Sequence, residues 1–226
     1  MLLTPGIDRR TGEYGDFGVP ATVVANFLRE QRIVPEKCDL NSILFLMTPA
    51  EDESKLNTLI AKLVMFKALW DADAPLHQVL PSLYAANGER YAGATIRSVC
   101  REMHAFYRSR DIKGLQRKCF RAESFPELAM LPQDAYRALV GNEVDYLPLD
   151  ECKGRIAATL ALIYPPGIGV VVPGERWDER AQPMLDYLHA FEESFNRFPG
   201  FNYEVQGVFQ ERVDGRIVFH TYVVRE

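Results

Sequence analysis

The chain has 226 residues, of which 47% are hydrophobic and 25% charged, and its formal net charge is −5. This composition is typical of a globular chain with a sizeable core. No basic stripe interleaved with aromatic residues and no apolar run of about 18 residues occurs, so the sequence does not support nucleic-acid binding or a membrane span. The first residues lack a basic-then-apolar signal pattern, and the cytoplasm is the expected location.

The first part of the chain predicts a helix, a strand and a second helix, an order typical of an α/β layer. Residues 1–18 read as a loop, and apolar spacing from Val19 predicts a helix that ends before Pro35. The apolar run 41–48 predicts a strand buried on both faces. Residues 48–70 predict an amphipathic helix with Thr48 or Ser54 as its cap.

The predicted strand 41–48 requires neighbours, because one strand cannot satisfy its own backbone groups. Two arrangements would satisfy this requirement. The strand joins a sheet formed later in the chain, or its partner strands lie in sequence outside this chain.

The helical spacing of apolar residues ends at Asp71, and the following segment is rich in small residues, prolines and glycines. We therefore place a domain boundary near Ala74. The expected domains are residues 1–74 and 75–226. Beyond the boundary the pattern predicts helices at 94–108, 112–121, 132–142 and 179–197. It predicts strands at 143–149, 155–164 and 168–172, and a hairpin around Asp214-Gly215. The second part is therefore α+β.

Cysteines and histidines are scattered along the chain. Cys38, Cys100, Cys119 and Cys152 have no CxxC spacing, and no HxxxH or HExxH pair is present. Spacing of this kind does not support a metal site. Reduced thiols are the expected state of the cysteines.

Four stretches carry a resemblance to one family: TPGIDRRTGEYGDFGVPATVVANFLRE, VPEKCDLNSILFLMTPAE, RSVCREMHAFY and YPPGIGVVVPGE. They resemble the C-terminal third of the bacterial ornithine/lysine/arginine decarboxylases, which depend on pyridoxal phosphate. The resemblance runs from about Thr4 to the C-terminus, and CDLNS is most similar to the ornithine members. It implies that residues 1–74 are the end of an aminotransferase-type small domain and that residues 75–226 are the family's C-terminal domain.

The chain departs from the family in one respect. The family's cofactor lysine follows a histidine, and no lysine of this chain does: Lys37, Lys55, Lys62, Lys67, Lys113, Lys118, Lys153. Without that lysine the cofactor's electron-sink chemistry cannot proceed. The resemblance therefore predicts a fragment that is inactive alone, with partner strands for 41–48 in the absent part.

Glu36, in VPEKCD, is the first candidate substrate-binding residue. A diamino acid carries a distal ammonium, which a water-excluding pocket must pair with a carboxylate. In the resembling family the glutamate of this Glu-Lys motif contacts that amino group. The alternative is a solvated loop acid, with Asp39 and Asn41 in a structural role around it.

Tyr164, which opens YPPGIGVVVPGE, is the second candidate. A residue before proline is held extended, so this tyrosine is presented in a set direction, toward a core or a pocket wall. The corresponding tyrosine of the family lies near the entrance of the active site. Gly167, Pro173 and Gly174 are expected to be turn residues. GIGVVV lacks the GxGxxG pattern of a dinucleotide site.

The resemblance implies decarboxylation of a basic amino acid, most closely ornithine to putrescine and carbon dioxide, by a complete enzyme that is a homo-oligomer. This chain would supply a pocket edge and a subunit interface. The rival hypothesis is a free-standing regulatory or assembly module that binds the full-length decarboxylase or a polyamine.

Overall fold

The computed structural model describes residues 1–8, 10–164 and 167–226. These residues form two compact units, one of residues 1–109 with 198–202 and one of residues 110–197 with 203–226. The α+β class predicted from the sequence is confirmed. The two compact units divide between residues 109 and 110. The family-domain boundary predicted near Ala74 is not a boundary of these units and stays a prediction.

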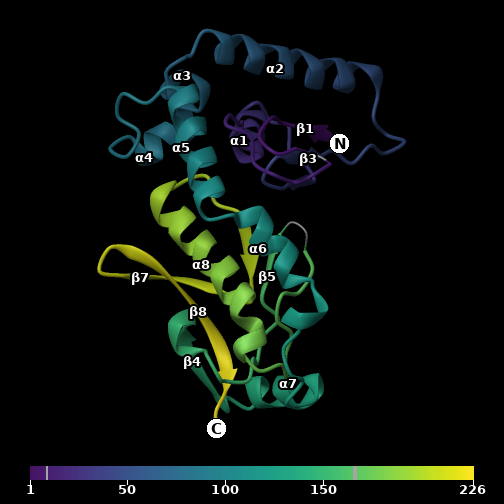
Figure 1. The fold of residues 1–226 in the computed structure, drawn as a ribbon. Coiled ribbons are helices and arrows are strands. Elements are labelled where there is room, and N and C mark those ends of the chain that lie inside the picture. Colours follow the sequence, from purple (N-terminus) through teal and green to yellow (C-terminus); the bar gives the residue numbers. More distant parts are fainter. Residues whose placement is uncertain (9, 165–166) are drawn as a thin grey trace. The chain divides into compact units, whose positions relative to one another are not determined.

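The first unit consists of short strands and helices, shown in purple to teal in Figure 1. Its strands are β1 (Leu2–Leu3), β2 (Lys37–Cys38) and β3 (Ser42–Leu44). Its helices are α1 (Ala21–Glu30), α2 (Glu53–Asp71), α3 (Leu76–Val79), α4 (Pro81–Asn87) and α5 (Ile96–Ser109). Residues 198–202 also belong to this unit, and the Tyr91 hydroxyl donates to the Pro199 carbonyl there at 2.9 Å.

The strand predicted at 41–48 differs from the observed strand in length and in partners. β3 covers only Ser42–Leu44, and Leu46 and Met47 beyond it are exposed. β3 pairs antiparallel with β1 on one side and β2 on the other. Both partners therefore lie within this chain, which corrects the expectation of a later sheet or of strands outside the sequence.

Two further corrections concern helices of the first unit. The N-cap of α2 is Asp52, which accepts from the Lys55 amide at 2.8 Å, and not Thr48 or Ser54. The region after Asp71, predicted to be irregular, contains α3 and α4, each shorter than the window in which a helical period becomes visible.

The second unit combines a three-stranded sheet, a two-stranded ladder and helices, shown in teal (α6) and in green to yellow in Figure 1. The sheet order is β4-β8-β7, with β4 (Val144–Pro148), β7 (Phe209–Val213) and β8 (Arg216–Val224). The ladder pairs β5 (Leu162–Tyr164) with β6 (Glu204–Gln206). The helices are α6 (Ile112–Cys119), α7 (Pro132–Val140) and α8 (Gln182–Arg197), with single 3₁₀ turns at Ala122–Ser124, Leu149–Glu151 and Glu179–Ala181.

Helix α8 packs against β8 and forms the core of the second unit. The rings of Phe195 and Phe219 meet edge to face at 5.3 Å. Asn196 donates to the Ile217 carbonyl at 2.7 Å and accepts from the Ile217 amide at 2.8 Å. One side chain thus satisfies both backbone groups of a strand residue and fixes the register between helix and sheet.

The predicted hairpin is confirmed, whereas two predicted strands are largely absent. Asp214 and Gly215 both have positive φ, at 51° and 80°, as a tight two-residue turn requires. The strand predicted at 155–164 is regular only over Leu162–Tyr164. The strand predicted at 168–172 is reduced to an isolated bridge between Ala161 and Val171.

Each cysteine is a buried free thiol. Burial raises the pKa of Cys38, Cys119 and Cys152 to about 12 and raises that of Cys100 as well. A thiol reacts as its thiolate. Burial keeps reagents away from these four thiols, and the raised pKa values keep them protonated at neutral pH.

We expect a chromogenic disulfide reagent to label almost no thiol in the native chain at pH 8 and all four after denaturation. Rapid labelling of one thiol without denaturant would show that its surroundings open.

Candidate functional site

The β2–β3 hairpin presents Glu36. The Glu36 amide donates to the Leu44 carbonyl at 2.9 Å, one step before the Lys37–Leu44 pair of the ladder. The Asp39 amide donates to the Ser42 carbonyl at 2.8 Å, and this hydrogen bond closes the turn between β2 and β3. The backbone of Glu36 is therefore fixed, while its side chain is exposed.

Asn41 ties this hairpin to two other segments. Its Nδ2 lies 2.7 Å from the Pro5 carbonyl oxygen, 3.2 Å from that of Val19 and 3.3 Å from Thr4 Oγ1. Gly6 makes room for the amide, since a Cβ there would lie 2.6 Å from Nδ2, and its φ of +139° disfavours a side chain. Asn41 thus orients the hairpin relative to the N-terminal loop and the start of α1.

A cavity of about 600 Å³ lies beside Glu36, within the first unit. It is bounded by the end of α1, the segment after β3 and the first turns of α2. Its apolar lining includes Ile33, Val34, Phe45, Leu46, Met47 and Leu56. An aliphatic chain of a few methylenes is the chemistry that such a wall accepts.

The two carboxylates of this cavity differ in their partners. Glu51 forms an ion pair with Lys55 at 3.3 Å. Among the residues that the structure describes, no cation or hydrogen-bond donor pairs with the Glu36 carboxylate. Glu36 is thus the acid available to a cation that enters, next to a wall that would hold an aliphatic chain.

Tyr164 ends β5 in the second unit, where it pairs with Glu204 across the ladder. Its half-buried ring lies over Gly167, where a Cβ would come within 2.6 Å of the ring. Gly167 has φ +74°, as expected of a turn residue. Pro165 and Pro166 lie outside the described residues. Tyr164 belongs to the second unit, and the cavity beside Glu36 is lined by residues of the first unit.

Glu102 and His104 are two residues apart in α5, so they do not share a helix face, and each has its own structural partner. Glu102 pairs with Arg90 at 2.8 Å. His104 is buried in α5, and its Nε2 lies 2.8 Å from the Gly15 carbonyl oxygen. Within the described part of the chain there is no cluster of three or more side chains suited to a metal ion.

The residues present do not fit pyridoxal phosphate. An imine-forming lysine needs a lowered pKa in an enclosed pocket, and no lysine of the described residues is buried. Lys55, the lysine at the Glu36 cavity, is exposed and paired with Glu51.

No helix in the described ranges is long and apolar enough to cross a bilayer.

Sequence reasoning found Glu36 but missed its surroundings. The Glu51–Lys55 ion pair has the i, i+4 spacing of a helical pair, which was a usable signal. The apolar wall consists of residues from three separate segments, and no local sequence pattern predicts that these segments come together. Asn41 was expected to be structural, and the three contacts of its amide show how.

Comparison with known proteins finds two sequence models that match separate parts of the chain. The sequence model of the "Orn/Lys/Arg decarboxylase, C-terminal domain" matches residues 113–225, and that of the "Orn/Lys/Arg decarboxylase, major domain" matches residues 1–55. The inducible ornithine decarboxylase of Escherichia coli (strain K12) is 54% identical over 225 residues, which is 100% of this chain and 30% of that protein. That of Lactobacillus sp. (strain 30a) is 50% identical over 96% of this chain and 29% of its own length.

Solved structures agree with the sequence matches. The constitutive lysine decarboxylase of E. coli superimposes with a TM-score of 0.90 at 32% identity, over 99% of this chain and 31% of that one. Lysine decarboxylase A of Pseudomonas aeruginosa gives a TM-score of 0.91 at 36% identity, over 99% of this chain and 30% of its own. The chain thus spans about 30% of the length of these relatives. It belongs to the Orn/Lys/Arg decarboxylase family.

Proposed function

We propose that this chain is the C-terminal part of a pyridoxal-phosphate-dependent decarboxylase that converts ornithine to putrescine and carbon dioxide in the cytoplasm. Residues 1–74 would end the small domain and residues 75–226 would form the C-terminal domain. The cofactor and its lysine would lie in the remainder of a homo-oligomeric enzyme. The observation that carries the proposal is the unpaired Glu36 carboxylate at a cavity with one apolar wall.

The role proposed for Glu36 is to bind the distal ammonium of the substrate. A charge-assisted hydrogen bond to a carboxylate is about twice as strong as a neutral one. The methylenes of the substrate would lie along the apolar lining around Leu46, Met47 and Leu56. This arrangement holds one end of the substrate and leaves its reacting end to the part of the enzyme that holds the cofactor.

Ornithine is favoured over lysine by the comparisons. Ornithine decarboxylases of E. coli, Lactobacillus and Haemophilus influenzae are 49–54% identical to this chain, whereas the lysine decarboxylases of P. aeruginosa and E. coli are 32–40% identical. The two substrates differ by one methylene, which a pocket discriminates by about 10- to 200-fold.

A graft tests the proposal. This chain would replace the matching C-terminal region of the inducible E. coli ornithine decarboxylase, and carbon dioxide release would be measured with ornithine and lysine. We expect kcat/KM for ornithine to exceed that for lysine by about 10-fold or more. A folded graft with normal cofactor absorbance that prefers lysine, or that uses neither substrate, would contradict the proposal.

Tyr164→Phe in the graft should have a smaller effect. The change removes one hydroxyl and keeps the ring that lies over Gly167. If the hydroxyl lies at the entrance of the site, a lost neutral hydrogen bond should lower kcat/KM by about 2- to 12-fold. An unchanged kcat/KM would restrict Tyr164 to packing, and thermal unfolding of the same variant would show whether that packing is intact.

A further inference from the structure

Helix α2 carries an exposed apolar stripe. It is 19 residues long, and Phe66 is its buried residue. Leu56, Ile60 and Val64 follow one another at intervals of four and are 38%, 58% and 64% exposed. Residues at this spacing share one face of a helix. In Figure 1, α2 runs along the outside of the first unit.

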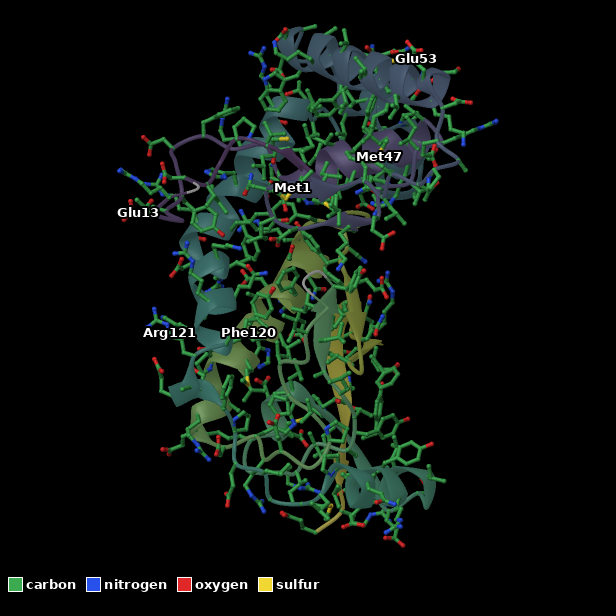
Figure 2. All side chains as sticks on the ribbon, turned by 90° about the vertical axis from the view of Figure 1, so that its right-hand side faces the viewer. Met1, Glu13, Met47, Glu53, Phe120 and Arg121 are labelled. Carbon is green, nitrogen blue, oxygen red and sulfur yellow. The ribbon has the colours of Figure 1, made fainter. Side chains whose placement is uncertain are left out.

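The apolar surface continues from α2 to the segment after β3. Leu46 and Met47 are 65% and 52% exposed, and both line the Glu36 cavity together with Leu56. Figure 2 labels Met47 and Glu53 at the two ends of the connection from this segment to α2. Single exposed apolar side chains are ordinary, but a contiguous group marks an interaction surface. We call Leu46, Met47, Leu56, Ile60 and Val64 the α2 patch.

We propose that the α2 patch is the docking surface for the part of the decarboxylase that precedes the region matched by this chain. The inference rests on the proposed function. The relatives extend over about three times the length of this chain, which covers 28–31% of them. The major-domain model matches residues 1–55, so Leu46 and Met47 of the patch lie within the matched segment and its three α2 residues lie directly after it.

Charge on the patch rim agrees with an apolar partner surface. Lys55 is paired with Glu51, and Lys67 with Asp71 at 2.5 Å. Both of these lysines are already paired within this chain, so an occupant need not supply opposite charges to them. A hydrophobic face of the same polypeptide meets this requirement better than a charged peptide or a nucleic acid.

Docking on the α2 patch would also change the Glu36 cavity. Leu46, Met47 and Leu56 belong to both, so an occupant of the patch lies over one wall of the cavity. Exclusion of water lowers the local dielectric and strengthens the interaction of a carboxylate with an ammonium. The patch therefore couples domain docking to substrate recognition.

Thiol accessibility tests this inference. The native cysteines are at most 8% exposed, so an introduced thiol is distinguishable by peptide mapping. Ile60→Cys places a thiol on the stripe, and Ala61→Cys is the matched control on the next residue, which is exposed and outside the patch. Maleimide labelling rates would be measured for both variants in the isolated chain and in the complete graft.

We expect Cys introduced at 60 to react at least about 10-fold more slowly in the graft than in the isolated chain, with little change at 61. Equal rates at 60 in both proteins would overturn the proposal. Protection that disappears when the graft is diluted to monomers would assign the patch to a second copy and would also overturn it. Decarboxylation by the same graft is read separately, so a fully active graft with a reactive thiol at 60 rejects docking but not the proposed function.

Discussion

The isolated chain, supplied with pyridoxal phosphate, is expected to release no carbon dioxide from ornithine, lysine or arginine. The physical reason lies in its lysines, none of which follows a histidine in sequence or is buried in the described structure. A lysine outside an enclosed, desolvated pocket does not form a stable imine in competition with water. The measurement is trapping of radiolabelled carbon dioxide, with heat-denatured chain as the blank.

Two observations together check this expectation. Absorbance of the chain with added cofactor should show no stoichiometric imine band, and the graft under the same conditions should show one. Carbon dioxide release above the blank by the isolated chain would mean that one of its lysines performs the role assigned to the absent domain.

Glu36→Gln in the graft should weaken the use of ornithine far more than the binding of cofactor. Glutamine keeps the shape and one acceptor of glutamate but removes the charge that compensates the distal ammonium. An ammonium left without its partner in a desolvated pocket should lower kcat/KM by about 30-fold to several thousand-fold. The cofactor absorbance should stay normal, since Glu36 belongs to a cavity whose residues do not fit the cofactor.

Glu53→Gln is the matched control for this variant. It makes the same chemical change at an exposed acid in the first turn of α2, outside the lining of the cavity. Its kinetics should stay within about twofold of the parent graft. If Glu36→Gln behaves like Glu53→Gln, then Glu36 is a solvated loop acid and its distal-ammonium role is wrong.

The sequence predicted the long elements of this fold well and the short ones poorly. Helices such as α5 and α8 bury one face over several turns, so their apolar spacing is visible in the sequence. β1 and β2 have two residues each, and a strand of two residues shows no alternation. Their backbone hydrogen bonds to β3 depend on the path of the whole first unit, which no local pattern encodes.

The candidate site was predictable only in part. Glu36 was found through its resemblance to a family motif, and helix periodicity alone would have left it in a loop. The cavity next to it depends on where α2 lies after β3. Asp52 was missed as the cap of α2 because Thr48 and Ser54 have the same capping chemistry and bracket it closely.

The contacts of Asn41 have a genetic consequence. Gly6 and Asn41 are far apart in sequence, yet a methyl group at residue 6 would occupy the space of the Asn41 amide. Substitutions at the two positions should therefore be epistatic, because either one alone already disrupts the contact between the Asn41 amide and the N-terminal loop. In a mutational scan of the complete enzyme, the effect of the double substitution should therefore be smaller than the sum of the effects of the two single substitutions.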